Sequence, residues 1–211
     1  MYQPPIFKEE RLDIMHDLIR SNNFCTLVTS VDDNLSAEHI PMMLHSEIGD
    51  FGTLRGHVSK GNPLWKTVGD GCAALAVFMG PDHYISPNWY PSKKEHQKEV
   101  PTWNYAAVHV HGELKVTTDA DWLLAMLHNM TDHHEKDEAV PWKVTDAPEK
   151  FVTQQLKGIV GIEIEITRLE GKVKAGQNKK EQDIIGAVDN LTTISTDEAL
   201  ATAKMMEKAK P

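Results

Sequence analysis

The sequence predicts a mainly β fold of the α+β class: a small antiparallel barrel with helices added at its periphery. Six or more segments carry the alternating or β-branched pattern of strands, and short turns join most of them. Three or four helical segments interrupt the strands without alternating regularly with them. This order disfavours a doubly wound parallel sheet.

The first half of the chain opens with helical spacing and continues with strand signals. Asp32-Asp33-Asn34 predicts a hairpin turn, and Pro41 marks a bulge or an edge in the return strand because proline cannot donate to the ladder. A short helix is expected to begin at Asn62 and Pro63, since proline is tolerated in a first turn. The other expected elements are a helix over 8–22 and strands over 24–31, 35–45 and 51–58.

The second half contains the clearest alternation. Val108, Val110 and Leu114 share one face of a strand over 106–117, and polar residues share the other. The remaining expected elements are a buried strand over 72–80, a helix over 121–135, a helix ending at Leu156, a strand over 159–169 and a short helix near the C-terminus.

Composition and charge limit the function classes. With 211 residues, 40% of them apolar and 25% charged, the chain can bury a globular core. The net charge of −9 opposes attraction to nucleic acid, and no helix-turn-helix is visible, so we expect direct nucleic-acid binding to be weak or absent. Cys25 and Cys72 form no CxxC pair, and neither a signal peptide nor a membrane-spanning run is evident. The cytoplasm is therefore the expected compartment.

The segment from Gly80 to Tyr105 concentrates aromatic residues, prolines and paired lysines. Such a composition favours a long loop, because proline interrupts helices and central strands. A loop of this length either lines a binding site for a planar anion or packs its rings on the core. The segment alone leaves both interpretations open.

The segment over 53–63, TLRGHVSKGNP, could bind phosphate. Arg55 and Lys60 are cations, Thr53 and Ser59 carry hydroxyls, and a helix start adds free N–H groups. The spacing matches neither a Walker loop nor a dinucleotide fingerprint, so a plain solvated connection remains the alternative.

The histidines offer no clear catalytic or metal site. His39 follows Glu38 in a strand, and His109 and His111 share a strand face without an obvious third ligand. We expect no metal site, and no nucleophile motif is present.

Several segments in order along the chain carry a family resemblance. They are MYQPPIF, AEHIPMML, GTLRGHVSKGNPLW, GPDHYISPNWYPSK, VPTWNYAAVHVHG and IVGIEIEITRLEGK. The chain closely resembles the PaiB family of FMN-binding transcriptional regulators up to about Lys174. The region from Gln182 onward lies outside this resemblance. The resemblance implies one domain over 1–174, followed over 175–211 by a polar linker and the short helix.

The resemblance further implies an antiparallel split β-barrel of the pyridoxamine-phosphate-oxidase-like, FMN-binding type. Such barrels work as homodimers with FMN in a cleft between the subunits. The resemblance implies that Arg55 and Thr53 bind the phosphate, and the residues expected near them are Gly56, His57 and Asn62. The residues expected near the ring, from the same or the other subunit, are His39, Tyr84, Ser86, Trp89 and Tyr90.

The implied function is negative regulation of sporulation and degradative-enzyme genes, with bound flavin reporting redox or metabolic state. An FMN-dependent oxidoreductase is an alternative, because the cofactor would then carry the chemistry without a side-chain motif. Two further alternatives are a heme-binding split barrel and a binding protein whose cofactor site has degenerated. No catalytic residue is assigned.

Overall fold

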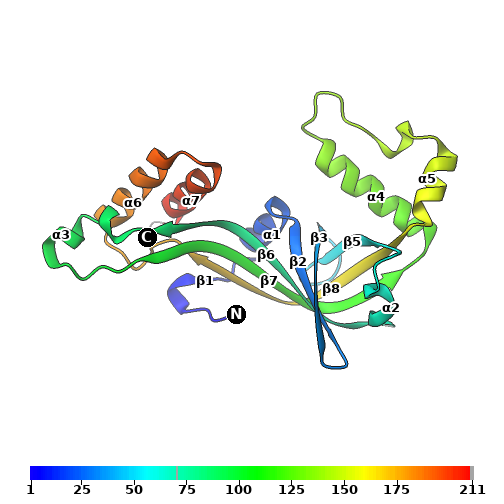
Figure 1. Cartoon of the computed structure of the whole chain (residues 1–211), viewed down its shortest axis with the longest axis horizontal. Helices are drawn as coiled ribbons and strands as arrows, with labels where there is room; N and C mark the ends of the chain where they lie inside the picture. The colour runs from blue at the N-terminus through cyan, green and yellow to red at the C-terminus, as the bar shows by residue number, and fades with distance from the viewer. Residues whose placement is uncertain (70, 210–211) are drawn as a thin grey trace. The chain divides into compact units, whose positions relative to one another are not determined.

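A computed structural model describes residues 1–69 and 71–209 (Figure 1). Its eight-stranded sheet has the order β3-β2-β6-β7-β8-β5-β4, with β1 added beside β8. The pairs β1–β8, β2–β3, β2–β6, β4–β5 and β5–β8 are antiparallel. The strands are β1 Lys8–Glu9, β2 Phe24–Val31, β3 Asn34–Pro41, β4 Met43–His45, β5 Thr53–Ser59, β6 Cys72–Ile85, β7 Thr102–Thr117 and β8 Ile159–Lys174. The mainly β, antiparallel class predicted from the sequence is confirmed.

Seven α-helices accompany this sheet in the described residues: α1 Leu12–Ser21, α2 Leu64–Val68, α3 Ser92–His96, α4 Ala120–Glu135, α5 Glu149–Leu156, α6 Glu181–Ile194 and α7 Asp197–Lys208. Short 3-10 turns form at Pro5–Phe7, Pro87–Trp89 and Val144–Asp146. No helix in the described part of the chain has the length and apolarity needed to cross a bilayer.

The chain divides into two compact units. The first comprises Met1–Asn22, Phe78–His109 and Glu170–Pro211; the second comprises Asn23–Val77 and Val110–Leu169.

The predicted hairpin in the second unit is confirmed. Asp32 and Asp33 have φ of 49° and 61°, the left-handed values that a tight hairpin turn between twisted strands requires. The return strand differs from the expectation because it breaks after Pro41. Met42 donates its N–H to the carbonyl of Asn23 (2.8 Å), and the chain then continues as β4, which pairs with β5.

The second unit buries apolar side chains on both faces of β5 and β8: helix α4 packs against one face, at Ile159 and Gly161, and the residues named next lie on the other face. Leu54 and Val58 alternate on β5, and Ile162 and Ile164 alternate on β8, all at most 4% exposed. Helix α4 begins at Asp119, whose carboxylate accepts the N–H of Trp122 (2.7 Å), as an N-cap residue does. Its buried stripe, which packs against Leu156 and Ile159, is Leu123, Met126 and Met130.

The first unit corrects the long loop expected over 80–105. Strand β6 continues through Gly80 and Pro81 to Ile85, and β7 begins at Thr102, so only residues 86–101 connect them. Pro81 fits a strand here because β6 pairs with β2 only over Ala74–Val77, and a proline beyond that ladder removes no bond to β2. The expected helix over 8–22 also begins later, at Leu12, because Lys8 and Glu9 pair with β8.

The C-terminal region contains two packed helices where we expected a polar linker and one short helix. In Figure 1, α6 and α7 lie side by side. Ile184, Ala187, Val188 and Leu191 repeat at helical spacing on α6, and all are buried. Together with Ile85 and Tyr90 they form an apolar cluster, so α6 packs on the connection that follows β6.

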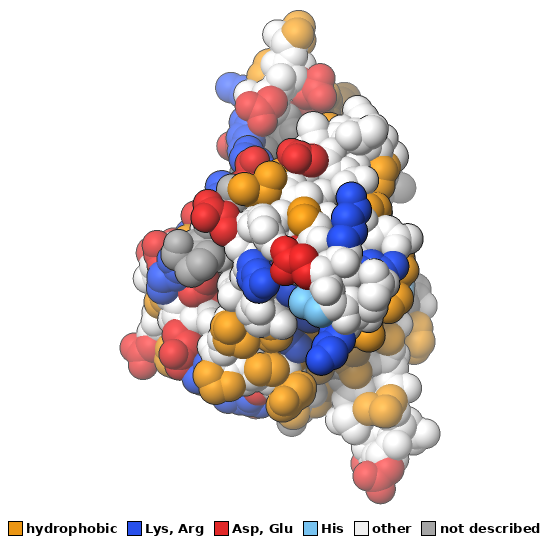
Figure 2. Space-filling view, turned by 90° about the vertical axis from the view of Figure 1, so that its left-hand side faces the viewer, with side chains coloured by type: hydrophobic (Ala, Val, Ile, Leu, Met, Phe, Trp, Pro, Cys, Tyr) orange, Lys and Arg blue, Asp and Glu red, His pale blue; other side chains and the backbone are white. Residues whose placement is uncertain are grey.

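A buried carboxylate fastens this connection to α6. Asp183, 1% exposed, accepts the N–H of Ser92 at the start of α3 (2.9 Å). Nearby, Lys179 pairs with Glu99, and Lys180 lies 3.4 Å from Glu95. Acidic and basic side chains are interspersed on the surface at this end of the unit (Figure 2).

We expect Asp183→Ala to lower the free energy of unfolding by about 1.5–3 kcal/mol, since the Ser92 N–H loses a charged acceptor in a buried place. Urea unfolding measures the change. Asp189→Ala, at an exposed position of the same helix, is the matched control and should change stability by less than about 0.5 kcal/mol. Equal effects of the two substitutions would contradict the importance of this bond.

Candidate functional site

Arg55 on β5 is the best-organised cation of the predicted phosphate site. Its Nε donates to Oε2 of Glu163 on β8 (2.7 Å), and its guanidinium carbon lies 5.5 Å from the centre of the Trp122 ring. About a quarter of the Arg55 side chain is exposed. The carboxylate and the ring therefore fix one edge and one face of the guanidinium. Its two terminal nitrogens have no hydrogen-bond partner among the described residues and can donate to an anion.

A glycine on β8 gives room for that ring. A Cβ at Gly161 would lie 2.4 Å from Cζ3 of Trp122. Gly161 pairs with His57 on β5. A side chain at this position would displace Trp122, and with it the surface on which Arg55 rests.

Thr53 and Asn62 already serve local structure. The Thr53 hydroxyl, in a residue 2% exposed, donates to the Ile48 carbonyl (3.2 Å). The Asn62 side-chain oxygen accepts the N–H of Leu64 at the start of α2 (2.8 Å). A phosphate bound by the Thr53 hydroxyl proton would have to replace the carbonyl of Ile48, so Thr53 is a weaker candidate than Arg55.

Gly56 and His57 follow Arg55 on β5. A Cβ at Gly56 would lie 2.7 Å from the Met42 sulfur and from the Pro41 carbonyl, so close packing accounts for this glycine. The Nδ1 atom of His57 is buried without a hydrogen-bond partner in the described structure, and burial lowers the pKa of His57. His57 is therefore a neutral imidazole at neutral pH.

His39 lies on β3, opposite Thr26 of β2, and its Nδ1 is 3.2 Å from the Thr26 hydroxyl oxygen. The side chain is exposed. His39 therefore lies in the second unit, as Arg55 does, and on a strand of the same sheet.

The aromatic candidates belong to the first unit. Tyr90 is 2% exposed, its ring lies 4.9 Å from the Lys179 ammonium, and burial beside Glu99 and Asp183 raises its pKa to about 12. Trp89 packs against the same cluster. For these two rings, packing on the core accounts for the aromatic character; a role beside flavin stays a prediction.

Ser86 serves local structure, whereas Tyr84 is exposed. The Ser86 hydroxyl accepts the N–H of Asn88 (3.2 Å) and so starts the 3-10 turn. Tyr84 is 40% exposed, and its ring meets the Trp103 ring edge to face at 6.2 Å. Tyr84 is therefore the aromatic candidate with a free surface.

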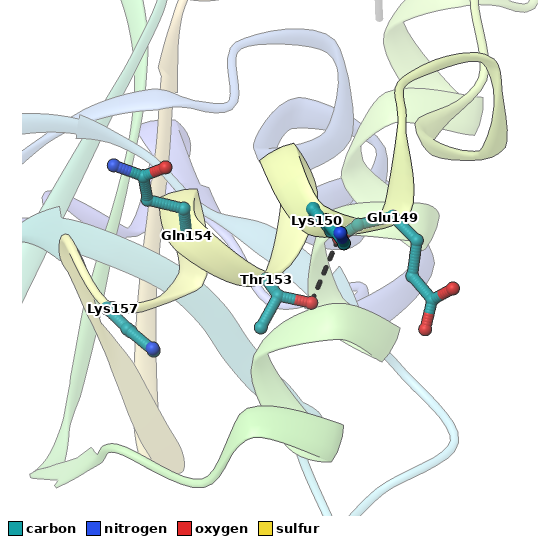
Figure 3. Close-up of a pocket in the computed structure, with 5 residues that line it drawn as sticks. All are labelled: Glu149, Lys150, Thr153, Gln154 and Lys157. Atoms are coloured by element: carbon teal, nitrogen blue, oxygen red, sulfur yellow. Dashed lines mark hydrogen bonds between the residues drawn. The ribbon is translucent and has the colours of Figure 1, made fainter.

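A hollow of about 610 Å³ lies on the second unit but contains none of these residues. Its lining comes from α5 and the residue after it, and the side chains spread along one helix (Figure 3). The Thr153 hydroxyl there bonds to the Glu149 carbonyl (2.9 Å). One helix face without converging polar groups is not the arrangement of a cofactor site.

Glu163 and Trp122, which contact Arg55, were not identified from the sequence. The strand expected over 159–169 and the helix expected over 121–135 contain them, but neither pattern identifies Arg55 as their partner. The pairing of β5 with β8, which sets Arg55 opposite Glu163, supplies it.

The fold has counterparts among solved flavoproteins. The FAD and heme binding protein from Mycobacterium smegmatis superimposes with a TM-score of 0.61, over 84% of this chain and 78% of that one, at 16% identity. The flavocytochrome Anf3 from Azotobacter vinelandii gives 0.55 over 85% and 75%, at 11% identity. The fold is thus the flavin-binding split barrel expected from the resemblance.

Sequence comparison gives the family. The model described as "Putative FMN-binding domain" matches residues 1–168, and the chain belongs to this family, whose cofactor is FMN. The chain is 32% identical to protease synthase and sporulation protein PAI 2 of Bacillus subtilis, over 98% of this chain and 97% of that protein. A protein of Emericella nidulans, AN0679, is 30% identical over 99% and 97%. Both alignments extend beyond Gln182, where the resemblance seen in the sequence ended.

His57 should make stability depend on pH. Its pKa is lowered in the folded chain, so below about pH 6.5 the unfolded chain binds a proton that the folded chain does not. The free energy of unfolding therefore decreases as the pH decreases. We expect His57→Asn to reduce the loss of unfolding free energy between pH 7.5 and 5.5 in urea titrations. The exposed His39→Asn is the control; an unchanged loss in His57→Asn would refute the assignment.

Proposed function

We propose that the protein binds FMN with the phosphate on Arg55 and acts as a homodimeric regulator. The observation that carries the phosphate assignment is the guanidinium geometry. Glu163 occupies only Nε and Trp122 only one face, which leaves a preoriented pair of terminal nitrogens for two phosphate oxygens. The N–H groups of Gly61 and Leu64, which follow β5, already donate to the Ser59 hydroxyl (3.2 Å) and to the Asn62 side-chain oxygen (2.8 Å), so the assignment depends on Arg55.

The regulatory part of the proposal rests on the relatives. The similarity to protease synthase and sporulation protein PAI 2 spans nearly the whole of both chains, which favours a related role. Bound flavin supplies two-electron and one-electron redox chemistry. In this proposal the protein orients the flavin and converts its redox state into a change of the surrounding surface. The net charge of −9 favours an effect through another protein over direct contact with DNA.

The dimer is supported by apolar side chains on the β2–β3 hairpin. Leu35 is 78% exposed and Phe24 is 66% exposed, and β3 is an edge strand of the sheet. Edge strands with exposed apolar residues favour pairing with another chain. We propose that the second copy covers this hairpin and that the cofactor lies at the interface.

FMN affinity tests the phosphate assignment. Arg55→Ala should weaken FMN binding by about 1.5–3 kcal/mol, the range for hydrogen bonds to charged groups, as measured by quenching of flavin fluorescence on titration. Arg55→Lys keeps the charge but loses the planar fork, so an intermediate loss is expected. Lys157→Ala, in the α5 hollow, is the control and should leave the affinity unchanged. Full affinity in a folded Arg55→Ala protein would place the phosphate elsewhere.

Sedimentation tests the dimer. Leu35→Asp places a charge on the hairpin and should shift the protein to monomers, weakening association by at least about tenfold, since burying a leucine contributes about 1.5–3 kcal/mol. Val140→Asp, 87% exposed between α4 and α5, is the matched control and should leave association intact. If the two variants associate alike, the hairpin is not the interface.

A further inference from the structure

The first unit has a sheet face that its helices leave uncovered. Ile85 of β6 and Val173 of β8 pack against the α6–α7 cluster, and Asn104 of β7 bonds to Met206 of α7. Because successive side chains on a strand point to opposite faces, the neighbouring positions point away from these helices. Those positions, here called the cationic aromatic face, are Tyr84, Trp103, Tyr105, Lys172 and Lys174.

Among the described residues, Lys172 and Lys174 of this face have no carboxylate partner. Lys172 is 8% exposed; its ammonium donates to the Tyr2 carbonyl (3.1 Å) and lies 5.2 Å from the centre of the Tyr105 ring. Lys174 donates to the Thr102 hydroxyl and to the Trp103 carbonyl (2.7 Å). All these partners are neutral, whereas Lys179, the next lysine along, pairs with Glu99.

Partial burial makes this pair of cations costly. An ammonium taken out of water is destabilising unless an anion neutralises it, and carbonyls and rings compensate only in part. Burial, together with the charges of Lys172 and Lys179, lowers the pKa of Lys174. The carboxylate of Glu170, two residues before Lys172, already pairs with the Met1 ammonium and lies 4.0 Å from His109. An added anion would therefore be stabilised here.

Exposed rings lie on the same face. Trp103 is 54% exposed and Tyr84 is 40% exposed, and the two meet edge to face. Such rings offer a surface on which a flat molecule can stack. Lys174 contacts the backbone of Trp103 itself, so the cation and the stacking surface adjoin.

We propose that the cationic aromatic face binds a small flat aromatic molecule that carries one carboxylate or phosphate group. Lys174 contacts the anionic group, and Trp103 and Tyr84 contact the ring. Lys172, which is covered by Tyr2, adds its positive charge without contact. This site is assigned from the first unit alone and does not depend on the phosphate role of Arg55. It goes beyond the proposed flavin function, because it gives the protein a second recognition surface for an organic acid or ester.

Isothermal titration with phenyl phosphate tests the site, with benzoate as the carboxylate probe. Phenyl phosphate should bind at least about tenfold tighter than inorganic phosphate, because the ring adds stacking. Lys174→Gln should weaken phenyl phosphate binding by about tenfold or more, and Trp103→Ala should remove its advantage over inorganic phosphate. Lys204→Gln, at an exposed position of α7, is the matched control and should have no effect.

Other outcomes would overturn the proposal. Absence of saturable phenyl phosphate binding up to about 10 mM would contradict it. Loss of phenyl phosphate binding in Arg55→Ala but not in Lys174→Gln would assign the anion to Arg55 and contradict the proposal. Failure of FMN binding alone would contradict the proposed flavin function and not this site. A weaker dimer in Lys174→Gln, without phenyl phosphate binding to the wild type, would show that a second copy covers the face.

Discussion

The pairing of β5 with β8 is the constraint on which the candidate phosphate site depends. The register sets Arg55 opposite Glu163 and His57 opposite Gly161. A shift by one residue would turn Arg55 toward the core occupied by Leu54 and Ile162, because strand side chains alternate between faces. The buried isoleucines of β8 therefore fix the register, and the register in turn places the guanidinium against its carboxylate and beside Trp122.

The C-terminal helices have a comparable effect on the first unit. They bury Tyr90 and cap α3 through Asp183, so the connection between β6 and β7 is a packed element rather than a free lid. A Cβ at Gly186 would lie 2.2 Å from the Trp89 carbonyl, which shows how closely α6 approaches this connection. The same helices cover one face of the sheet, and the cationic aromatic face lies on its other side.

The sequence was sufficient where the determinants were local. The Asp32-Asp33 turn and the strand over 159–169, in which Ile162 and Ile164 are buried, were predicted correctly because neighbouring residues determine them. The continuation of β6 through Pro81 was not predictable, since it depends on where β2 stops pairing. Helix α6 was missed, because the polar run before it obscured the spacing of Ile184 and Leu191, and the short helix expected near the C-terminus is α7. Arg55 was recognisable as a strand cation, but its partner is 108 residues away and follows only from strand pairing.

A crystal structure of the protein with FMN tests the central claim most directly. The account predicts that the terminal nitrogens of Arg55 lie about 2.7–2.9 Å from two phosphate oxygens, the usual distance for charged pairs, while Nε stays bonded to Glu163. A phosphate bound elsewhere, with Arg55 still on Glu163 and its terminal nitrogens in contact with solvent alone, would contradict it.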